Sequence, residues 1–141
     1  MAFEISAMEM DIIIKLLAAT GFGLLIGVER ELNKSAAGLK TFSIVCLGSA
    51  LFTVAALSTG SATAVSGVIS GIGFLGAAVV FRGPDKVSGL TTAALVWTTA
   101  AIGVATGFSL YYAAAAVTIL VLVILIPIEY LEKRLIKKHR Q

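Results

Sequence analysis

The stretch TFSIVCLGSALFTVAAL, residues 41–57, decides the class of this protein because it contains no charged side chain. Its length is close to the roughly 20 apolar residues that a helix needs to cross the hydrocarbon core of a bilayer. Inside lipid, backbone N–H and C=O groups must find partners within the protein, and a helix satisfies them within one segment. The sequence therefore predicts a transmembrane helix over this stretch.

Four further apolar segments of similar length are marked out by the positions of the charged residues along the chain. The five predicted spans are residues 11–28, 41–57, 63–81, 88–106 and 111–130. The predicted fold class is all-α, a polytopic membrane protein with five transmembrane helices. Residues 1–130 would form one transmembrane domain, and residues 131–141 a basic cytoplasmic tail into which the fifth helix continues.

The composition of the whole chain supports this class. Of its 141 residues, 58% are hydrophobic and 13% are charged, whereas soluble domains average about 45–50% and 25%. A soluble domain of this size could not cover so much apolar surface, which excludes an ordinary soluble enzyme and a disordered chain. The single cysteine, Cys46, cannot form an intrachain disulfide and is predicted to be a small buried hydrophobic residue.

The basic residues indicate an orientation. With these five spans, ten of the eleven Lys and Arg residues lie on one side of the membrane, and Lys15 is the exception. Short loops rich in Lys and Arg remain in the cytoplasm, so the N-terminus is predicted outside and the C-terminus inside. Basic residues at membrane edges also explain the net charge of +3 without a nucleic-acid partner. The basic tail is expected to bind anionic membrane lipid.

An internal repeat links the two halves of the chain. The motif GFGLL at residues 21–25 resembles GIGFL at residues 71–75, and each is followed by an arginine and then by Gly-Leu-x-Thr. Both copies run from outside to inside and back, which predicts two hairpins in parallel orientation plus a fifth helix. The alternative is that glycine-rich membrane helices resemble one another through composition alone.

Small residues that recur every four positions let membrane helices approach closely. Segment 63–81 is the richest in them, with Ser66, Ser70 and Ala77 beside its glycines, and is predicted to lie at the centre of the bundle. The glycines could serve packing within one chain or the seam of a homodimer, and a homodimer is expected. Trp97, in the middle of a span, is predicted to pack in the core. The glycines assigned to helix packing are Gly23, Gly27, Gly67, Gly71, Gly73 and Gly76, together with Gly103 and Gly107 in the fourth span.

Two polar clusters at the inner face are the places where chemistry could occur. Glu29, Glu31 and Asp85 are candidate ligands for a divalent cation such as Mg²⁺, which requires several oxygen ligands. Arg30 and Arg82, at equivalent positions of the repeat, could pair with these carboxylates across a shared cytoplasmic vestibule. The alternative is that the two arginines only anchor the topology and form local ion pairs. The spans hold no carboxylate at mid-membrane depth, which argues against a proton or cation relay. No catalytic motif and no Cys/His metal pattern is present, so neither enzymatic activity nor a cofactor is predicted.

These motifs, taken in order, resemble the MgtC/SapB family of bacterial membrane proteins over roughly residues 16–127. The matching stretches are GVERE at 27–31, AGLKT at 37–41, SGVISGIGFLGA at 66–77, GLTTAA at 89–94 and AAIG at 100–103. The residues that carry the family motifs are Glu29, Arg30, Gly38, Thr41, Gly71, Gly73, Gly76, Arg82, Gly89, Thr91, Thr92 and Trp97.

The resemblance implies a five-helix domain in the bacterial cytoplasmic membrane, associated with adaptation to low magnesium and with virulence. It also implies action on other membrane proteins, including transporters and the ATP synthase. Many members carry a soluble C-terminal domain, which this chain is expected to lack because it ends about ten residues beyond Tyr130. A virulence role is for that reason not expected.

Two functions are considered. The first is a modulator of magnesium homeostasis or membrane energetics that acts through membrane-protein contacts, and the missing mid-membrane carboxylate favours it. The second is a transporter of Mg²⁺ or another cation, which the internal repeat favours. In either case Mg²⁺ would be a substrate or a signal rather than a cofactor.

Overall fold

A computed structural model of the protein describes residues 6–82 and 87–138. Within these residues the chain forms five helices: α1 (Ala7–Leu32), α2 (Leu39–Thr59), α3 (Ala62–Ala78), α4 (Leu90–Gly107) and α5 (Tyr111–Lys138). Two short antiparallel strands, β1 (Phe81–Arg82) and β2 (Val87–Ser88), lie between α3 and α4. Three helices, α1, α2 and α4, are long and apolar enough to cross a membrane, and α3 and α5 contain the shorter apolar segments Val65–Ala78 and Tyr111–Ile126. The predicted number and order of helices are confirmed.

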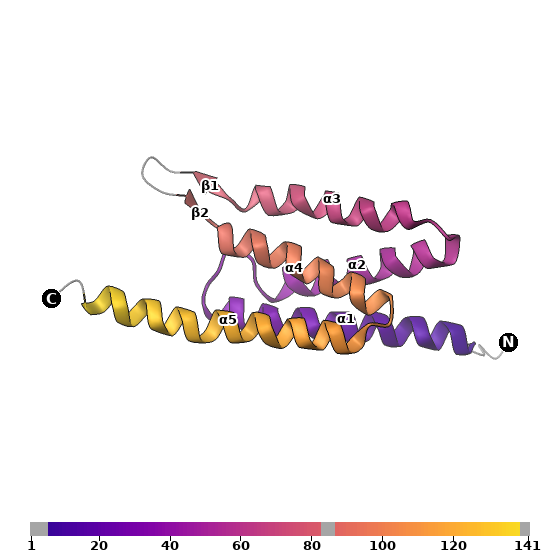
Figure 1. The fold of residues 1–141 in the computed structure, drawn as a ribbon, viewed down its shortest axis with the longest axis horizontal. Coiled ribbons are helices and arrows are strands. Elements are labelled where there is room, and N and C mark those ends of the chain that lie inside the picture. Colours follow the sequence, from indigo (N-terminus) through magenta and orange to yellow (C-terminus); the bar gives the residue numbers. More distant parts are fainter. Residues whose placement is uncertain (1–5, 83–86, 139–141) are drawn as a thin grey trace.

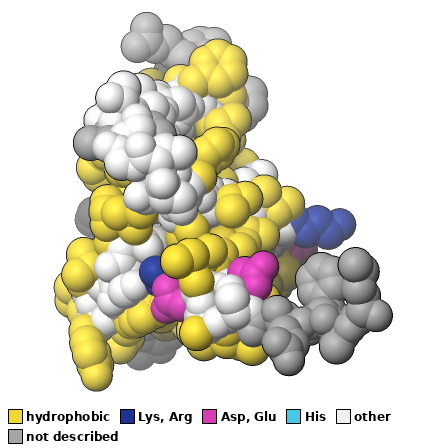
Figure 2. Space-filling view, turned by 90° about the vertical axis from the view of Figure 1, so that its right-hand side faces the viewer, with side chains coloured by type: hydrophobic (Ala, Val, Ile, Leu, Met, Phe, Trp, Pro, Cys, Tyr) yellow, Lys and Arg dark blue, Asp and Glu magenta, His cyan; other side chains and the backbone are white. Residues whose placement is uncertain are grey.

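Consecutive helices run in opposite directions, so that α1, α3 and α5 point one way and α2 and α4 the other (Figure 1). The α1–α2 connection, the strand pair and the C-terminal end of α5 lie together at one end of the molecule. The α2–α3 and α4–α5 connections lie at the other end and contain no Lys or Arg. Figure 2 looks onto this second end, where hydrophobic side chains predominate and charged ones are few. The charge asymmetry behind the predicted orientation is therefore present in the fold, while the orientation itself remains a prediction.

Some helix boundaries differ from the predicted ones. The third span was expected to continue to residue 81, but α3 ends at Ala78 and the chain turns into β1. Where the chain returns, Gly89 is the N-cap residue of α4, and its φ of +85° is one that side chains other than glycine rarely adopt. A Cβ at Gly89 would also collide with the carbonyl oxygen of Val79. At the other end of the chain, the predicted extension of the fifth helix is confirmed, since α5 runs to Lys138.

Helix α2 packs against α1, α3 and α4, and α4 packs against all four other helices. On the side of α1, glycines allow the close approach: a Cβ at Gly23 would lie 2.6 Å from the carbonyl oxygen of Phe42, and one at Gly27 would lie 2.6 Å from the Cα of Leu39. Small residues thus bring the two backbones together where larger ones would separate them.

On its other side α2 meets two glycines of α4. A Cβ at Gly103 would collide with the carbonyl oxygen of Cys46, and one at Gly107 would lie 2.6 Å from the Cβ of Thr53. Cys46 and Thr53 are both fully buried. The prediction that Cys46 is a buried residue is therefore confirmed, and it lies in the tightest part of the core.

The position of α3 corrects one prediction. This helix lies at the edge of the bundle rather than at its centre (Figure 1), and Ser66 and Ser70 are exposed. A Cβ built on Gly67, Gly71 or Gly73 would meet nothing within 4 Å, whereas one on Gly76 would lie 3.5 Å from the carbonyl oxygen of Ala93 in α4. The closest packing lies instead around α2, because α1 and α4 each bring their own glycines against it. The three open glycines make no close helix contact within one chain.

Trp97 is also placed differently from the prediction. Its side chain is 54% exposed, so the expectation that it packs in the core is wrong. It lines an apolar hollow of about 300 Å³ beside α3, together with Ile69 and Ala101. The face of α4 that carries Gly103 approaches α2 too closely for an indole ring, and Trp97 lies on another face of α4, beside α3.

Candidate functional site

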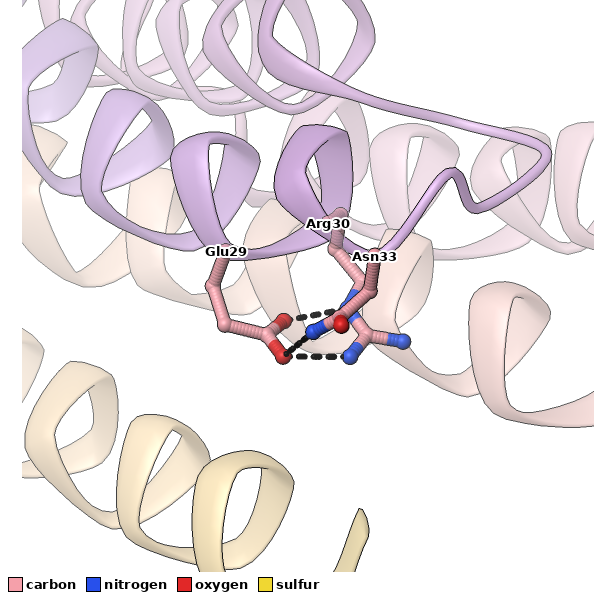
Figure 3. A network of polar contacts seen from close by, with 3 residues as sticks. All are labelled: Glu29, Arg30 and Asn33. Atoms are coloured by element: carbon pink, nitrogen blue, oxygen red, sulfur yellow. Dashed lines mark hydrogen bonds and ion pairs between the residues drawn. The ribbon is translucent and has the colours of Figure 1, made fainter. Parts of the chain in front are cut away.

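The last turns of α1 carry a buried polar cluster at the end of the molecule where the basic connections lie. Glu29 and Arg30 are each only 7% exposed. The Arg30 guanidinium donates two hydrogen bonds to the Glu29 carboxylate, one from Nε and one from Nη2, the latter 2.5 Å long. Asn33, one turn later, donates from Nδ2 to Glu29 Oε1 at 2.7 Å. Figure 3 shows the side chains of Arg30 and Asn33 converging on the Glu29 carboxylate.

Because this ion pair is buried, changing either residue affects the stability of the fold. An ion pair removed from water loses hydration that its mutual attraction only partly restores, so its presence is weak evidence of added stability. Removal of one partner, by contrast, lowers the free energy of unfolding by about 3–5 kcal/mol, because it leaves an uncompensated buried charge. Glu29 and Arg30 therefore act as one unit, and neither charge can be removed without consequence for the other.

Glu31 has a different task. It is exposed, and its Oε2 accepts a hydrogen bond of 3.1 Å from the backbone N–H of Leu39, the first residue of α2. Gly38, the N-cap residue of α2, has no side chain that could make this bond. A Cβ at Gly38 would collide with the Glu31 carboxylate. The end of α1 therefore caps the start of α2 through Glu31 and the space left by Gly38.

The turn between the two helices contains one strained residue. Ser35 donates its N–H to the carbonyl of Arg30 and Lys34 donates to that of Glu31, both at 3.0 Å. This pair of bonds is the Schellman motif, in which the residue after the helix adopts a left-handed conformation that usually requires glycine. Here Lys34 occupies that position with a φ of 52°. The turn keeps this conformation although Lys pays a penalty of about 1–2 kcal/mol for it.

The structure does not gather the predicted cation ligands into one site. Glu29 is buried against Arg30 and Asn33, whereas Glu31 is exposed and bound to Leu39. Asp85 lies outside the described residues. Across residues 6–82 and 87–138, no group of three His, Cys, Asp or Glu side chains lies close enough to hold a metal ion. A cation at Glu29 would have to displace the hydrogen bonds that the carboxylate already accepts.

The remaining motif residues are spread over the fold. Thr41 and Thr91 are exposed near the starts of α2 and α4, and Thr92 is 6% exposed. Arg82 is in β1, but its side chain lies outside the described part, so the shared vestibule with Arg30 remains a prediction. The contact that sequence reasoning missed is Glu31 with Leu39. Its only sequence signal is an α2 that begins at a glycine, without Ser, Thr, Asp or Asn as its own cap.

Hydroxyl groups inside the bundle mostly bind their own helix. Thr53, Thr106 and Thr118 each donate a 2.8 Å hydrogen bond to the carbonyl four residues earlier. Thr99 is fully buried, and its Oγ1 has no hydrogen-bond partner among the described residues. A hydrogen bond to the carbonyl four residues earlier, as Thr53, Thr106 and Thr118 make, satisfies a hydroxyl in a membrane helix without the help of a neighbouring helix.

Comparison with known proteins gives consistent results. The sequence profile described as the MgtC family matches residues 16–134. Protein MgtC of Salmonella typhimurium strain LT2 is 42% identical over 113 residues, which cover 78% of this chain and 49% of the relative. Protein SapB of Bacillus subtilis is 37% identical over 134 residues, which cover 86% of this chain and 56% of the relative. The chain thus spans about half the length of these curated relatives. No solved structure matches it.

Proposed function

The chain belongs to the MgtC family of multi-pass membrane proteins, and from this membership we propose that it modulates adaptation to low magnesium or membrane energetics by binding helices of other membrane proteins. A second copy of the chain is one such partner. The proposed role is non-catalytic and takes place in the bacterial cytoplasmic membrane. It rests on the exposed face of α3, and the activity of the longer relatives is not assumed for this chain.

The observation that carries the proposal is a stripe of small residues on the outer face of α3, formed by Ser66, Ser70, Gly73 and Ala77. All four are exposed, and their spacing of four, three and four places them along one side of a helix. Small residues in such a row let a second membrane helix approach closely, and hydroxyls can hydrogen-bond across the contact. The glycines of α1 and α4 allow the same close approach within the chain, where α2 already packs against them.

Five membrane crossings and a cytoplasmic C-terminus belong to the same proposal. The alternating helices and the gathering of basic connections at one end support it (Figure 1). Short loops rich in Lys and Arg remain in the cytoplasm, which would place the Glu29–Arg30 cluster at the inner surface. There it would fix the end of α1 and the start of α2 rather than line a path through the membrane.

Transport of Mg²⁺ or another cation is the second candidate, and the repeated hairpins favour it, because parallel repeats build some transporters. The hydrogen bonds of Glu29 and Glu31 weigh against it, since both carboxylates already have protein partners. A cation would have to compete with a neighbouring guanidinium for Glu29. We therefore rank transport below the contact function.

Blocking the outer stripe tests the first function. Ser70→Leu combined with Gly73→Leu should abolish the ability of the chain to support growth of a deletion strain at low Mg²⁺. The matched control is Gly21→Leu in α1, where a Cβ would also meet nothing within 4 Å. Equal helix content of the three proteins by circular dichroism shows that they fold. Full growth with the blocked stripe would overturn the proposal.

A flux measurement separates the two functions. The protein is reconstituted into sealed liposomes that contain a Mg²⁺ indicator dye, and Mg²⁺ is added outside. The contact function predicts the flux of empty liposomes. A saturable flux above that of empty liposomes would establish transport and refute the ranking given above.

A further inference from the structure

A second apolar hollow lies between α2 and α3, on a different flank of α3 from the outer stripe. Its volume is about 600 Å³. Apart from Ser49, its lining consists of apolar side chains and glycines. The residues that shape it are Ile44, Gly48 and Phe52 of α2 and Gly67, Gly71 and Leu75 of α3.

The hollow is a groove that runs along the helices. On each helix the three residues that shape the groove are four positions apart, so each row follows its helix over about 12 Å at a rise of 1.5 Å per residue. A Cβ on Gly48, Gly67 or Gly71 would meet nothing within 4 Å, so the walls are bare backbone at three points. Space of this kind between membrane helices must be filled by something other than this chain.

The rim of the groove indicates what can enter. Ile44, Phe52 and Leu75 are large and stand out from it, with 67%, 61% and 48% of their surfaces exposed. A helix, about 10–12 Å across with its side chains, would be held away from the glycines by these three residues. A flexible hydrocarbon chain can pass between them. The groove therefore fits an acyl chain better than a partner helix, in contrast to the outer stripe.

A cation marks one end of the groove. Lys40 precedes Ile44 by one helical turn on α2 and is exposed, and no ion pair joins it to any of the described acidic residues. Glu31 contacts this end of α2 through Leu39, the residue that also meets Gly27 of α1. Its carboxylate is thus held on the side of α2 that faces α1. A long apolar groove that ends at an exposed ammonium matches a molecule with a hydrocarbon tail and an anionic head.

We propose that the α2–α3 groove binds one acyl chain of an anionic phospholipid whose phosphate headgroup contacts Lys40. The ammonium group reaches the headgroup while its methylene stem stays along apolar surface. Lipid binding at this site does not depend on the partner contacts proposed for the outer stripe of α3, and either can be correct without the other.

Tryptophan quenching by brominated lipid tests this site in the full chain. Phe52→Trp in a Trp97→Phe background places the single indole on the rim of the groove. The protein is reconstituted in phosphatidylcholine vesicles, and dibrominated phosphatidylglycerol or dibrominated phosphatidylcholine is added. We expect phosphatidylglycerol to bind at least about threefold more tightly than phosphatidylcholine at the groove. Added inorganic phosphate should not compete, because it lacks the acyl chain.

Two variants and one control assign the effect. Lys40→Gln should remove the preference for phosphatidylglycerol, while Lys34→Gln, a change at another exposed lysine of the same end, should leave it intact. Gly71→Leu should fill the groove and reduce quenching by both lipids. Equal quenching by the two lipids in the parent, or an unchanged preference in Lys40→Gln, would overturn the proposal. If the tryptophan variant does not fold, native mass spectrometry of the unmodified chain and its Lys40→Gln variant decides by the amount of phosphatidylglycerol retained.

Discussion

Glu31 at the end of α1 binds Leu39 at the start of α2, with its carboxylate 3.1 Å from the backbone nitrogen. The two helices cross closely at the same place, because Gly27 lies against Leu39. One acidic side chain therefore fixes both the angle of the turn and the first N–H group of the next helix. A carboxylate at a helix N-terminus also meets the positive end of the helix dipole.

Removing this cap should measurably weaken the fold. Glu31→Ala is expected to lower the free energy of unfolding by about 1 kcal/mol, as for other lost helix caps. Gly38→Ala should cost a similar amount, because its methyl group would push the Glu31 carboxylate away from Leu39. The measurement is chemical unfolding in detergent micelles, followed by helix content.

The double variant makes this prediction specific. If both changes act by breaking the same hydrogen bond, Glu31→Ala with Gly38→Ala should be no less stable than the worse single variant, a clear failure of additivity. Two independent costs that simply add would show that Gly38 is required for some other reason.

The buried pair of Glu29 and Arg30 should behave as a unit in the same way. Arg30→Met leaves the Glu29 carboxylate buried with the loss of its ionic partner, and the expected destabilisation is about 3–5 kcal/mol. Glu29→Gln with Arg30→Met removes both charges and should be less damaging than Arg30→Met alone. Lys40→Met, at an exposed site, should change stability by less than about 0.5 kcal/mol. A double variant less stable than Arg30→Met would contradict the structural role given to the pair.

The sequence predicted the helices well because membrane spans are long and the signal is strong. Uncharged runs such as residues 41–57 leave little choice but a helix in lipid, and charged residues mark the first and third connections between spans. Boundaries were less certain where a special backbone conformation decides them. Gly89 begins α4 with a positive φ, and a glycine in a sequence does not reveal that conformation.

Which helix lies at the centre could not be predicted from small residues alone. A row of small residues shows that another helix can pack closely against this one. It does not show which helix does so. The space beside Gly23 and Gly103 is occupied by atoms of α2, whereas the space beside Gly73 is empty, although all three are glycines in apolar helices. The cap formed by Glu31 was missed for a related reason, because its partner Leu39 is eight residues away and has no polar side chain.

The glycines provide a direct test of this difference. Gly103→Ala would collide with the carbonyl oxygen of Cys46, a backbone atom that cannot rotate away, and overpacking of this kind costs about 1–3 kcal/mol. Gly73→Ala meets open space and should be neutral or stabilising by up to about 1 kcal/mol, because alanine favours the helix. Labelling of Cys46, the single thiol, by a maleimide reports the difference. We expect faster labelling in Gly103→Ala and the parent rate in Gly73→Ala, and equal rates would refute the packing of α4 on α2.

Lys34 offers a prediction of the opposite sign, a gain of stability next to the candidate site. Its φ of 52° costs a side chain other than glycine about 1–2 kcal/mol, and the two Schellman hydrogen bonds of the turn involve only backbone atoms. Lys34→Gly should therefore keep the turn and raise the free energy of unfolding by about 1 kcal/mol, less the entropy that glycine adds to the unfolded chain. Lys34→Val, branched at Cβ, should lower it, because such residues are poorly tolerated at positive φ. Thermal unfolding of the three proteins at the same pH gives the order glycine, lysine, valine. If glycine proves the least stable of the three, the lysine side chain itself must hold the turn, and the strain assigned to this position would be wrong.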